Sequence, residues 1–247
     1  MLSQTPADTM ERLIPELCSP TDATGMATLQ LHVARYEFAA KHGRGTRWLD
    51  IACGVGYGTS LLKQHRPDIG EIVGVDISPT AIEYACSHYV MEGVRFVCAD
   101  ALTFRDAPFD TIVSLETLEH LDAPGDLLKR FSTELLAPDG ILIASVPITP
   151  SVDVNPWHKH DFTYRSFRQL LHCHGFLIVA EMVQIQHFNP WRIAMRAEAR
   201  AKSLRPRLAV YYCAHPRLLF RRILAICRYG FTNRYLTVAC RQIRAPR

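Results

Sequence analysis

A glycine-rich turn follows an acidic residue near position 50. The stretch WLDIACGVGYGTS, residues 48–60, carries Asp50 in an apolar run and then Gly54, Gly56 and Gly58. A turn that binds the pyrophosphate of a dinucleotide has the spacing G-x-G-x-x-G, but residue 59 is a threonine. A carboxylate such as Asp50 repels a pyrophosphate and attracts a cation. The turn therefore favours a ligand that lacks phosphate and carries a positive charge.

Three further acidic residues follow apolar, strand-like runs. Asp76 ends the run EIVGVD, Asp100 comes shortly after VRFVC, and Glu116 directly follows FDTIVSL. The carboxyl ends of parallel strands share one edge of a sheet, and ligands of α/β proteins bind at that edge. We therefore expect Asp50, Asp76, Asp100 and Glu116 to lie along one ligand-binding edge.

Histidines follow two of these expected strands. His120 comes shortly after Glu116, and His158 and His160 lie in the loop NPWHKHDF. Histidine is the side chain best suited to take a proton near neutral pH, so these three are candidates for a catalytic base. The alternative is that they hold their turns together through hydrogen bonds. The loop offers no clear fourth metal ligand, and no metal site is predicted.

These side chains require a sheet that brings strand ends together. Strand-like runs alternate with runs whose apolar residues share one helical face, which predicts an α/β fold with a doubly wound, mostly parallel sheet. Seven strands are expected, at 46–52, 71–76, 94–98, 109–115, 141–146, 176–183 and 234–240. We expect four segments: an N-terminal helical extension at 1–45, the ligand-binding core at 46–187, a basic helical insertion at 188–232, and the last strand and tail at 233–247.

Five motifs in order resemble the class I S-adenosylmethionine-dependent methyltransferases. They are LDIACGVGYG, GVDIS, FVCADA, FDTIVSLETLEHL and LLAPDGILIASVP, and the resemblance covers roughly residues 31–183. It implies a Rossmann-like sheet and S-adenosylmethionine as cofactor. That molecule has no phosphate and carries a sulfonium and an amino-acid end, which suits the acid at the start of the turn.

The resemblance also implies roles for individual residues. Asp76 would bind the two ribose hydroxyls, Asp100 the adenine amino group, and Glu116 the methionine end or the acceptor. Arg35 or Tyr36 would bind the cofactor carboxylate; the alternative is an exposed arginine and a packed tyrosine on one helix. The full set of expected cofactor-binding residues is Arg35, Tyr36, Asp50, Ala52, Gly54, Gly56, Asp76, Ile77, Asp100, Ala101 and Glu116.

The basic segment before the last strand departs from the minimal pattern of that family. Residues 188–234 hold eleven Lys and Arg but a single acid, Glu198. Bulky apolar residues and arginines around 216–229 are typical of a helix that lies on an anionic membrane. The alternatives are a helix packed on its own domain and a homodimer interface. No nucleic-acid recognition module is visible, so nucleic acid is not an expected partner.

The bulk composition limits the setting of the protein. The chain has 247 residues and a net charge of +4, which suits one large domain or one domain with an appendage. No signal peptide or membrane-spanning run is evident, so we expect a cytoplasmic protein. Peripheral attachment to the inner face of the membrane is compatible with this expectation. Eight cysteines without a C-x-x-C pair suggest buried free thiols.

The function expected from the sequence is methyl transfer from S-adenosylmethionine to an oxygen, less readily a nitrogen, of a small-molecule, glycan or lipid-linked acceptor. One alternative is a cofactor-binding enzyme of another reaction type, such as a cyclase. A second alternative is a non-catalytic cofactor-binding module associated with a membrane. A nicotinamide-dependent dehydrogenase is disfavoured by Asp50 and by the missing third glycine of its fingerprint.

Overall fold

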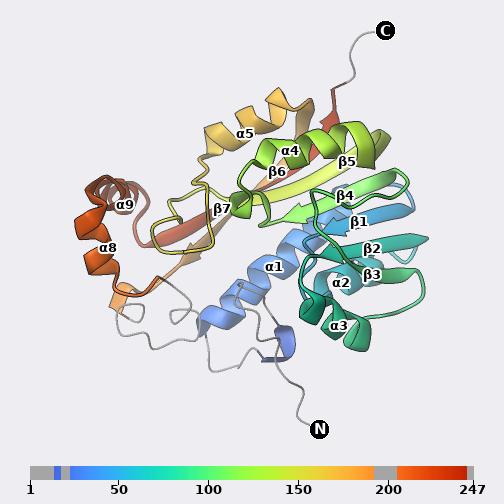
Figure 1. The fold of residues 1–247 in the computed structure, drawn as a ribbon, viewed down its shortest axis with the longest axis horizontal. Helices are drawn as coiled ribbons and strands as arrows, with labels where there is room; N and C mark the ends of the chain where they lie inside the picture. The colour runs from blue at the N-terminus through green and yellow to red at the C-terminus, as the bar shows by residue number, and fades with distance from the viewer. Residues whose placement is uncertain (1–13, 18–22, 192–204, 244–247) are drawn as a thin grey trace.

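The computed structural model describes residues 14–17, 23–191 and 205–243. Its centre is a seven-stranded sheet in the order β3-β2-β1-β4-β5-β7-β6 (Figure 1). Strands β1 to β5 are parallel to one another, and β7 runs antiparallel to both β5 and β6. The predicted doubly wound, mostly parallel, seven-stranded sheet is therefore confirmed. The strands are β1 Arg47–Ile51, β2 Glu71–Asp76, β3 Val94–Cys98, β4 Phe109–Leu115, β5 Leu136–Pro147, β6 Phe176–His187 and β7 Thr232–Gln242.

Helices cover both faces of this sheet (Figure 1). Trp48, Leu62 and Ile72 belong to the buried cluster on the face of α1 and α2, whereas Leu49, Leu127 and Phe167 belong to the cluster on the face of α4 and α5. Burying one such side chain stabilises the fold by roughly 1.5–3 kcal/mol. The helical elements are η1 Pro15–Leu17, α1 Ala23–His42, α2 Tyr57–His65, α3 Pro79–His88, η2 Leu118–His120, α4 Pro124–Arg130, η3 Phe131–Leu135, α5 Tyr164–Cys173, α8 Leu208–Ala214 and α9 Pro216–Tyr229.

Two helix starts follow directly from local sequence. The Ser78 hydroxyl accepts a hydrogen bond from the Ala81 N–H, and Pro79 occupies the first turn of α3, where its missing N–H costs nothing. Thr163 and Ser166 exchange hydrogen bonds in a capping box at the start of α5. These caps fix the loops that precede both helices, and each loop leaves the carboxyl end of a strand.

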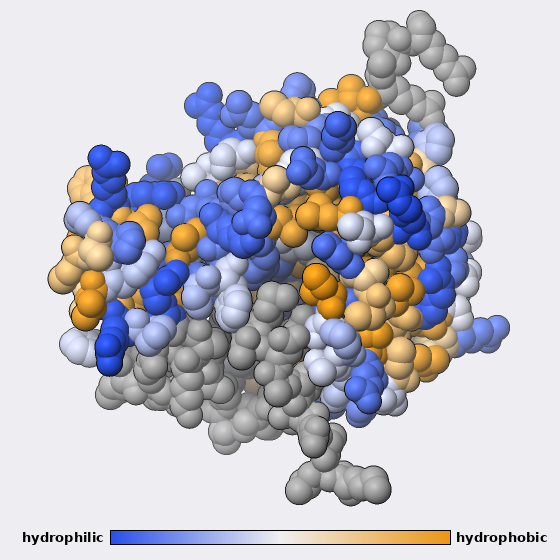
Figure 2. Space-filling view, viewed as in Figure 1, coloured by the Kyte–Doolittle hydropathy of each residue, from blue (hydrophilic) through white to orange (hydrophobic). Residues whose placement is uncertain are grey.

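The insertion before β7 forms helices α8 and α9 beyond the end of the sheet, beside the loop between β5 and α5 (Figure 1). Leu219, Phe220, Ile223 and Leu224 of α9 are 36% to 61% exposed. The alternative in which this apolar face packs on its own domain is therefore wrong for these four side chains. Figure 2 shows hydrophobic and hydrophilic residues intermixed in this part of the surface.

The structure bears on two expectations from the composition, the absence of a membrane-spanning run and the state of the cysteines. Within the described residues, no helix has the length and apolar character needed to cross a membrane. The seven cysteines of the described part are free, as expected, but only Cys53 and Cys240 are buried. The expectation of buried thiols is wrong for the other five, because they lie on solvent-facing positions of their helices and strands.

Candidate active site

A pocket of about 220 Å³ opens at the carboxyl ends of β1, β2 and β4. The acidic side chains at this edge are Asp76, Asp100 and Glu116, and no Lys or Arg is among the described residues that line it. Such a pocket suits a ligand with positive charge and disfavours a pyrophosphate. Nine predicted site residues line it: Tyr36, Ala52, Gly54, Asp76, Ile77, Asp100, Ala101, Glu116 and His120.

The glycine turn after β1 is wound into left-handed backbone. Ala52 has φ 60°, Gly54 has φ 56° and Gly56 has φ 87°. A Cβ on Gly56 would lie 2.7 Å from both Ala85 and Phe96, so only glycine fits there. Gly56 therefore shapes the turn from behind and does not line the pocket. Backbone strain of this kind persists where the surrounding structure demands it, often at ligand sites.

Asp76 joins this turn to the end of β2. Its Oδ2 accepts a hydrogen bond from the Gly54 N–H and its Oδ1 accepts one from the Ser78 N–H, both at 2.9 Å. A carboxylate offers about four lone-pair sites, so both oxygens retain capacity for a ligand. Asp100 is held similarly, because its Oδ1 accepts from the Leu102 N–H at 2.8 Å. Both acids are thus fixed at the pocket edge by backbone donors.

Asp50 lies beneath the turn and does not line the pocket. Its side chain is buried, and its Oδ2 accepts a hydrogen bond from the Thr59 hydroxyl at 2.6 Å. Tyr36 also hydrogen-bonds to it. Burial raises the pKa of Asp50 to about 7, against an ordinary value of 3.8. Its carboxyl group is therefore held behind the pocket wall and changes charge near neutral pH.

Tyr36 and Arg35 reach the site from α1 in different ways. Tyr36 lines the pocket, and a Cβ on Gly58 would lie 1.9 Å from its ring, so that glycine permits the close approach of α1 to α2. Arg35 is only 1% exposed, which rules out the alternative of an exposed arginine. It does not line the pocket: its Nε donates to Gln184 Oε1 at 2.8 Å, and its Nη1 lies 3.7 Å from Glu116 Oε1.

Glu116 occupies the first position after β4 with a left-handed φ of 50°. Its Oε1 accepts a hydrogen bond from the Ser145 hydroxyl at 2.8 Å, and its N–H donates to the Ser145 carbonyl oxygen at 3.1 Å. Arg35 and Ser145 thus hold the carboxylate of Glu116 at the pocket wall. Nη1 of Arg35 is buried without a hydrogen bond in the described structure, which leaves one donor near this carboxylate.

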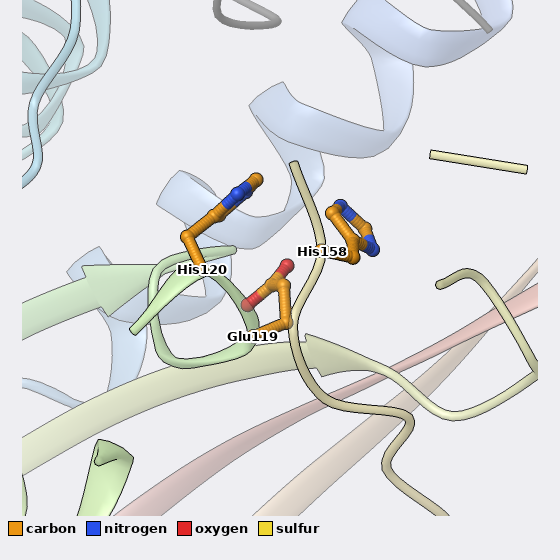
Figure 3. A group of neighbouring side chains, drawn as sticks. All are labelled: Glu119, His120 and His158. Carbon is orange, nitrogen blue, oxygen red and sulfur yellow. The ribbon is translucent and has the colours of Figure 1, made fainter. Parts of the chain in front are cut away.

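His120 and His158 meet at the mouth of the pocket (Figure 3). Their ring centroids are 4.7 Å apart with the ring planes nearly perpendicular. His120 Nδ1 lies 3.2 Å from the Trp157 carbonyl oxygen, and His158 Nδ1 lies 2.7 Å from the Ser151 hydroxyl. Glu119 lies beside both rings.

His160, the third predicted histidine, lies outside this group. Its Nε2 donates to the Asp122 carbonyl oxygen at 3.1 Å. The neighbouring Asp161 binds backbone groups: its Oδ1 accepts from the N–H groups of Ser151 and Val152. His160 and Asp161 therefore brace the loop 150–161.

A buried ion pair joins this loop to α9. Arg222 donates to Asp153 Oδ1 at 2.6 Å and to Oδ2 at 2.8 Å, and the Tyr212 hydroxyl donates to Oδ2 at 2.7 Å. Burial alone would raise the pKa of Asp153, but Arg222 holds it below its ordinary value. Sequence reasoning missed this pair, because its two residues are 69 positions apart.

Sequence reasoning also missed His32 and Tyr57, which line the pocket. His32 precedes Tyr36 by one helical turn, so its position on the same helix face as Tyr36 could have indicated it.

Comparisons with known proteins identify a methyltransferase domain in this chain. Residues 49–144 match the family model of a methyltransferase domain. A ubiquinone biosynthesis O-methyltransferase of Chelativorans sp. (strain BNC1) is 37% identical over 119 residues, which are 46% of this chain and 45% of that protein. The chain thus spans less than half the length of this curated relative.

Solved structures share the fold. The [4+2]-cyclase SpnF aligns with a TM-score of 0.58 and 19% identity, over 86% of this chain and 81% of that one. The N-methyltransferase NodS from Bradyrhizobium japonicum WM9, in complex with S-adenosyl-L-homocysteine, aligns with a TM-score of 0.57 and 16% identity, over 87% of each chain. At these identities the likeness establishes the fold alone.

Proposed function

The chain belongs to the class I S-adenosylmethionine-dependent methyltransferases, and we propose that it transfers a methyl group from S-adenosylmethionine to an oxygen of a small acceptor. The observation that carries this proposal is the pocket in which Asp76 and the left-handed glycine turn meet. Its lining combines three acids with no Lys or Arg among the described residues, which fits a ligand that carries a sulfonium and no phosphate.

The residues present fit S-adenosylmethionine, which when bound supplies a methyl group on a positively charged sulfur. Asp76 would accept hydrogen bonds from the ribose hydroxyls, and Asp100 with Ala101 would contact the adenine. Ile77, which is exposed at the pocket edge, offers an apolar contact for the adenine ring. The remaining contacts to the amino-acid end would come from Tyr36, Ala52, Gly54 and Glu116, with Asp50, Gly56 and Arg35 supporting them from behind.

An oxygen acceptor requires removal of a hydroxyl proton. His120 lines the pocket, and His158 lies beside it, so one of them would take that proton while the pocket walls align the reacting oxygen. His160 would support the loop, because its Nε2 is engaged by a backbone carbonyl. The O-methyltransferase relatives favour oxygen over nitrogen as the methylated atom.

We propose that the acceptor is a small molecule, a glycan or a lipid-linked molecule, and that a lipid-linked acceptor is approached from the membrane surface. Helix α9 exposes Leu219, Phe220, Ile223 and Leu224 next to the exposed arginines 217, 221 and 228. A helix of this kind gains free energy from apolar burial and from attraction to anionic lipids. We propose that the protein is cytoplasmic and attaches peripherally to the inner face of the membrane through α9. The competing arrangement is a homodimer formed through this same face of α9.

A second candidate function is a cyclisation, because the cyclase SpnF shares the fold. A cyclase would leave the cofactor unchanged, whereas a methyltransferase forms one S-adenosylhomocysteine for each methylated product. Measuring both products in one reaction therefore separates the two functions. A non-catalytic module would give neither product with any acceptor.

The binding site is tested with Asp76→Ala. Two charge-assisted hydrogen bonds to the ribose contribute roughly 1.5–3 kcal/mol each, so the affinity for S-adenosylmethionine should fall by at least about tenfold in calorimetry. Asp126→Ala, at an exposed position of α4, is the matched control and should bind as the wild type does. Unchanged affinity in folded Asp76→Ala protein would remove Asp76 from the site. A mass-spectrometric screen for gain of one methyl group across acceptors then tests the reaction.

A further inference from the structure

We propose that Glu119, His120 and His158 bind a divalent transition-metal ion, Zn²⁺ by preference, at the mouth of the pocket. Each of the three residues offers one ligand atom, and these atoms all lie within 4.8 Å of one another. Figure 3 shows the three side chains gathered between the turn after β4 and the loop 150–161. One carboxylate and two imidazoles form a ligand set that suits zinc and leaves a coordination position open.

Outer contacts orient both imidazole rings. The Trp157 carbonyl oxygen near His120 Nδ1 can only accept, so that nitrogen carries the proton and Nε2 carries the lone pair in the neutral ring. The Ser151 hydroxyl lies 2.7 Å from Nδ1 of His158 and holds the orientation of that ring, and either atom can be the donor. Metal-binding histidines commonly hold their second nitrogen to a backbone carbonyl or a polar side chain, which sets the tautomer and the ring orientation.

The two segments that supply the ligands are tied together by the backbone. The Glu119 carbonyl oxygen accepts from the Lys159 N–H at 2.8 Å and from the His160 N–H at 3.2 Å. The Lys159 ammonium pairs with Asp122 at 2.7 Å. The ligands from η2 and from the loop are therefore brought together by the fold itself, which lowers the entropy cost of binding an ion.

Burial of the carboxylate adds an electrostatic reason. Glu119 is 1% exposed, and a carboxylate at this depth gains from a positive charge close by. A divalent ion between this carboxylate and two neutral imidazoles would supply that charge. The other histidine of the loop, His160, lies outside the group and so provides a natural control.

The open coordination position gives the ion a role that rests on the proposed methyl transfer. His120 lines the pocket together with Glu116, so an acceptor that enters here reaches the ion with its hydroxyl oxygen. A bound divalent ion lowers the pKa of such a hydroxyl. The proton leaves to water, and the oxygen becomes the nucleophile for the methyl group. With the ion bound, His120 and His158 act as ligands, and this role replaces the proton-accepting role given to them above for the site without an ion.

The test measures metal binding directly. Protein stripped with a chelator is titrated with Zn²⁺ against a chromogenic competitor, and the bound metal is counted after dialysis by mass spectrometry. Wild-type protein and His160→Ala should bind one ion per chain, whereas Glu119→Gln, His120→Ala and His158→Ala should each lose at least about tenfold in affinity. Wild-type protein that binds zinc no better than His158→Ala would overturn the proposal, as would three variants that bind like the wild type.

A second measurement separates this proposal from the proposed function. Affinity for S-adenosylmethionine is measured by calorimetry on the same samples, and His158→Ala should bind it as the wild type does. Zinc binding without any cofactor binding would reject the methyltransferase function and leave the metal site standing. Cofactor binding and methyl transfer that persist unchanged in chelator-treated wild type would reject the metal and return the histidines to the role of base.

Discussion

Replacing Asp50 by asparagine should change how the stability of the protein depends on pH. Asp50 is fully enclosed beneath the glycine turn, between the Thr59 hydroxyl and Tyr36. An asparagine keeps the size of the side chain and can still accept from Thr59 through its carbonyl oxygen. The substitution therefore removes the titration of residue 50 while preserving the packing around it.

The size of the effect follows from the raised pKa. Burial moves the pKa of Asp50 from 3.8 in an ordinary environment to about 7 in the folded protein. One pKa unit corresponds to roughly 1.4 kcal/mol, so ionising the buried carboxyl costs the native state roughly 4 kcal/mol in full. The pKa of Asp50 is higher in the folded protein than in the unfolded chain. The neutral carboxyl therefore makes its full contribution to stability at pH values below the pKa of the unfolded chain. This contribution is lost as the pH rises through about 7.

The assay is urea unfolding of wild type and Asp50→Asn from about pH 5 to about pH 8. Over that range the wild type should lose roughly 2–3 kcal/mol of unfolding free energy relative to the variant. Other titrating groups cancel in the difference between the two proteins. Asp126→Asn, at an exposed site on α4, should run parallel to the wild type.

Parallel curves for wild type and Asp50→Asn would refute the reasoning. That result would mean that Asp50 keeps the same charge across the range in the folded and the unfolded chain. A wild type that gains stability relative to the variant as the pH rises would be a stronger contradiction, because a raised pKa can only lower its relative stability over this range.

Two further predictions concern helix α9. Arg222→Ala leaves Asp153 buried without its partner and should lower the unfolding free energy by roughly 3–5 kcal/mol in urea, whereas Arg217→Ala, on the exposed side, should change it by less than about 0.5 kcal/mol. Equal losses of unfolding free energy in the two variants would show that the Arg222–Asp153 pair does not stabilise the fold. Arg217→Glu with Arg228→Glu should abolish co-sedimentation with anionic vesicles at low salt and spare cofactor binding, because each arginine contributes about 1 kcal/mol of attraction; wild-type protein that ignores such vesicles would exclude the membrane as partner.

The sheet and most of the pocket could be predicted from the sequence because both depend on local pattern. Asp76 and Asp100 follow apolar runs, and parallel strands bring such positions to one edge. The prediction that Asp50 lines the pocket is wrong, and the reason also lies in the local geometry of its strand. Asp50 lies inside β1, in register with Gly74 and Val113, and its side chain points to the α2 face of the sheet and not to the edge.

The contacts that depend on long-range packing were beyond the sequence. Glu119 and His158 are brought together by backbone bonds between η2 and the loop 150–161, which no periodicity encodes. The same holds for Arg222: as part of a basic, apolar helix it looked like a membrane-facing arginine, yet it turns inward to Asp153. The membrane test therefore uses Arg217 and Arg228, which are exposed.

The pocket lining and part of the support for the loop at its mouth come from separate stretches of the chain. Every described residue that lines the pocket falls between His32 and Leu121. Part of the bracing of the loop 150–161, by contrast, comes from Arg222 and Tyr212 of the insertion. Mutations in the later stretch can thus reshape what meets the mouth of the pocket without touching its walls. Substitutions at Arg222 or Asp153 should therefore shift this loop relative to the pocket while leaving the pocket lining unchanged.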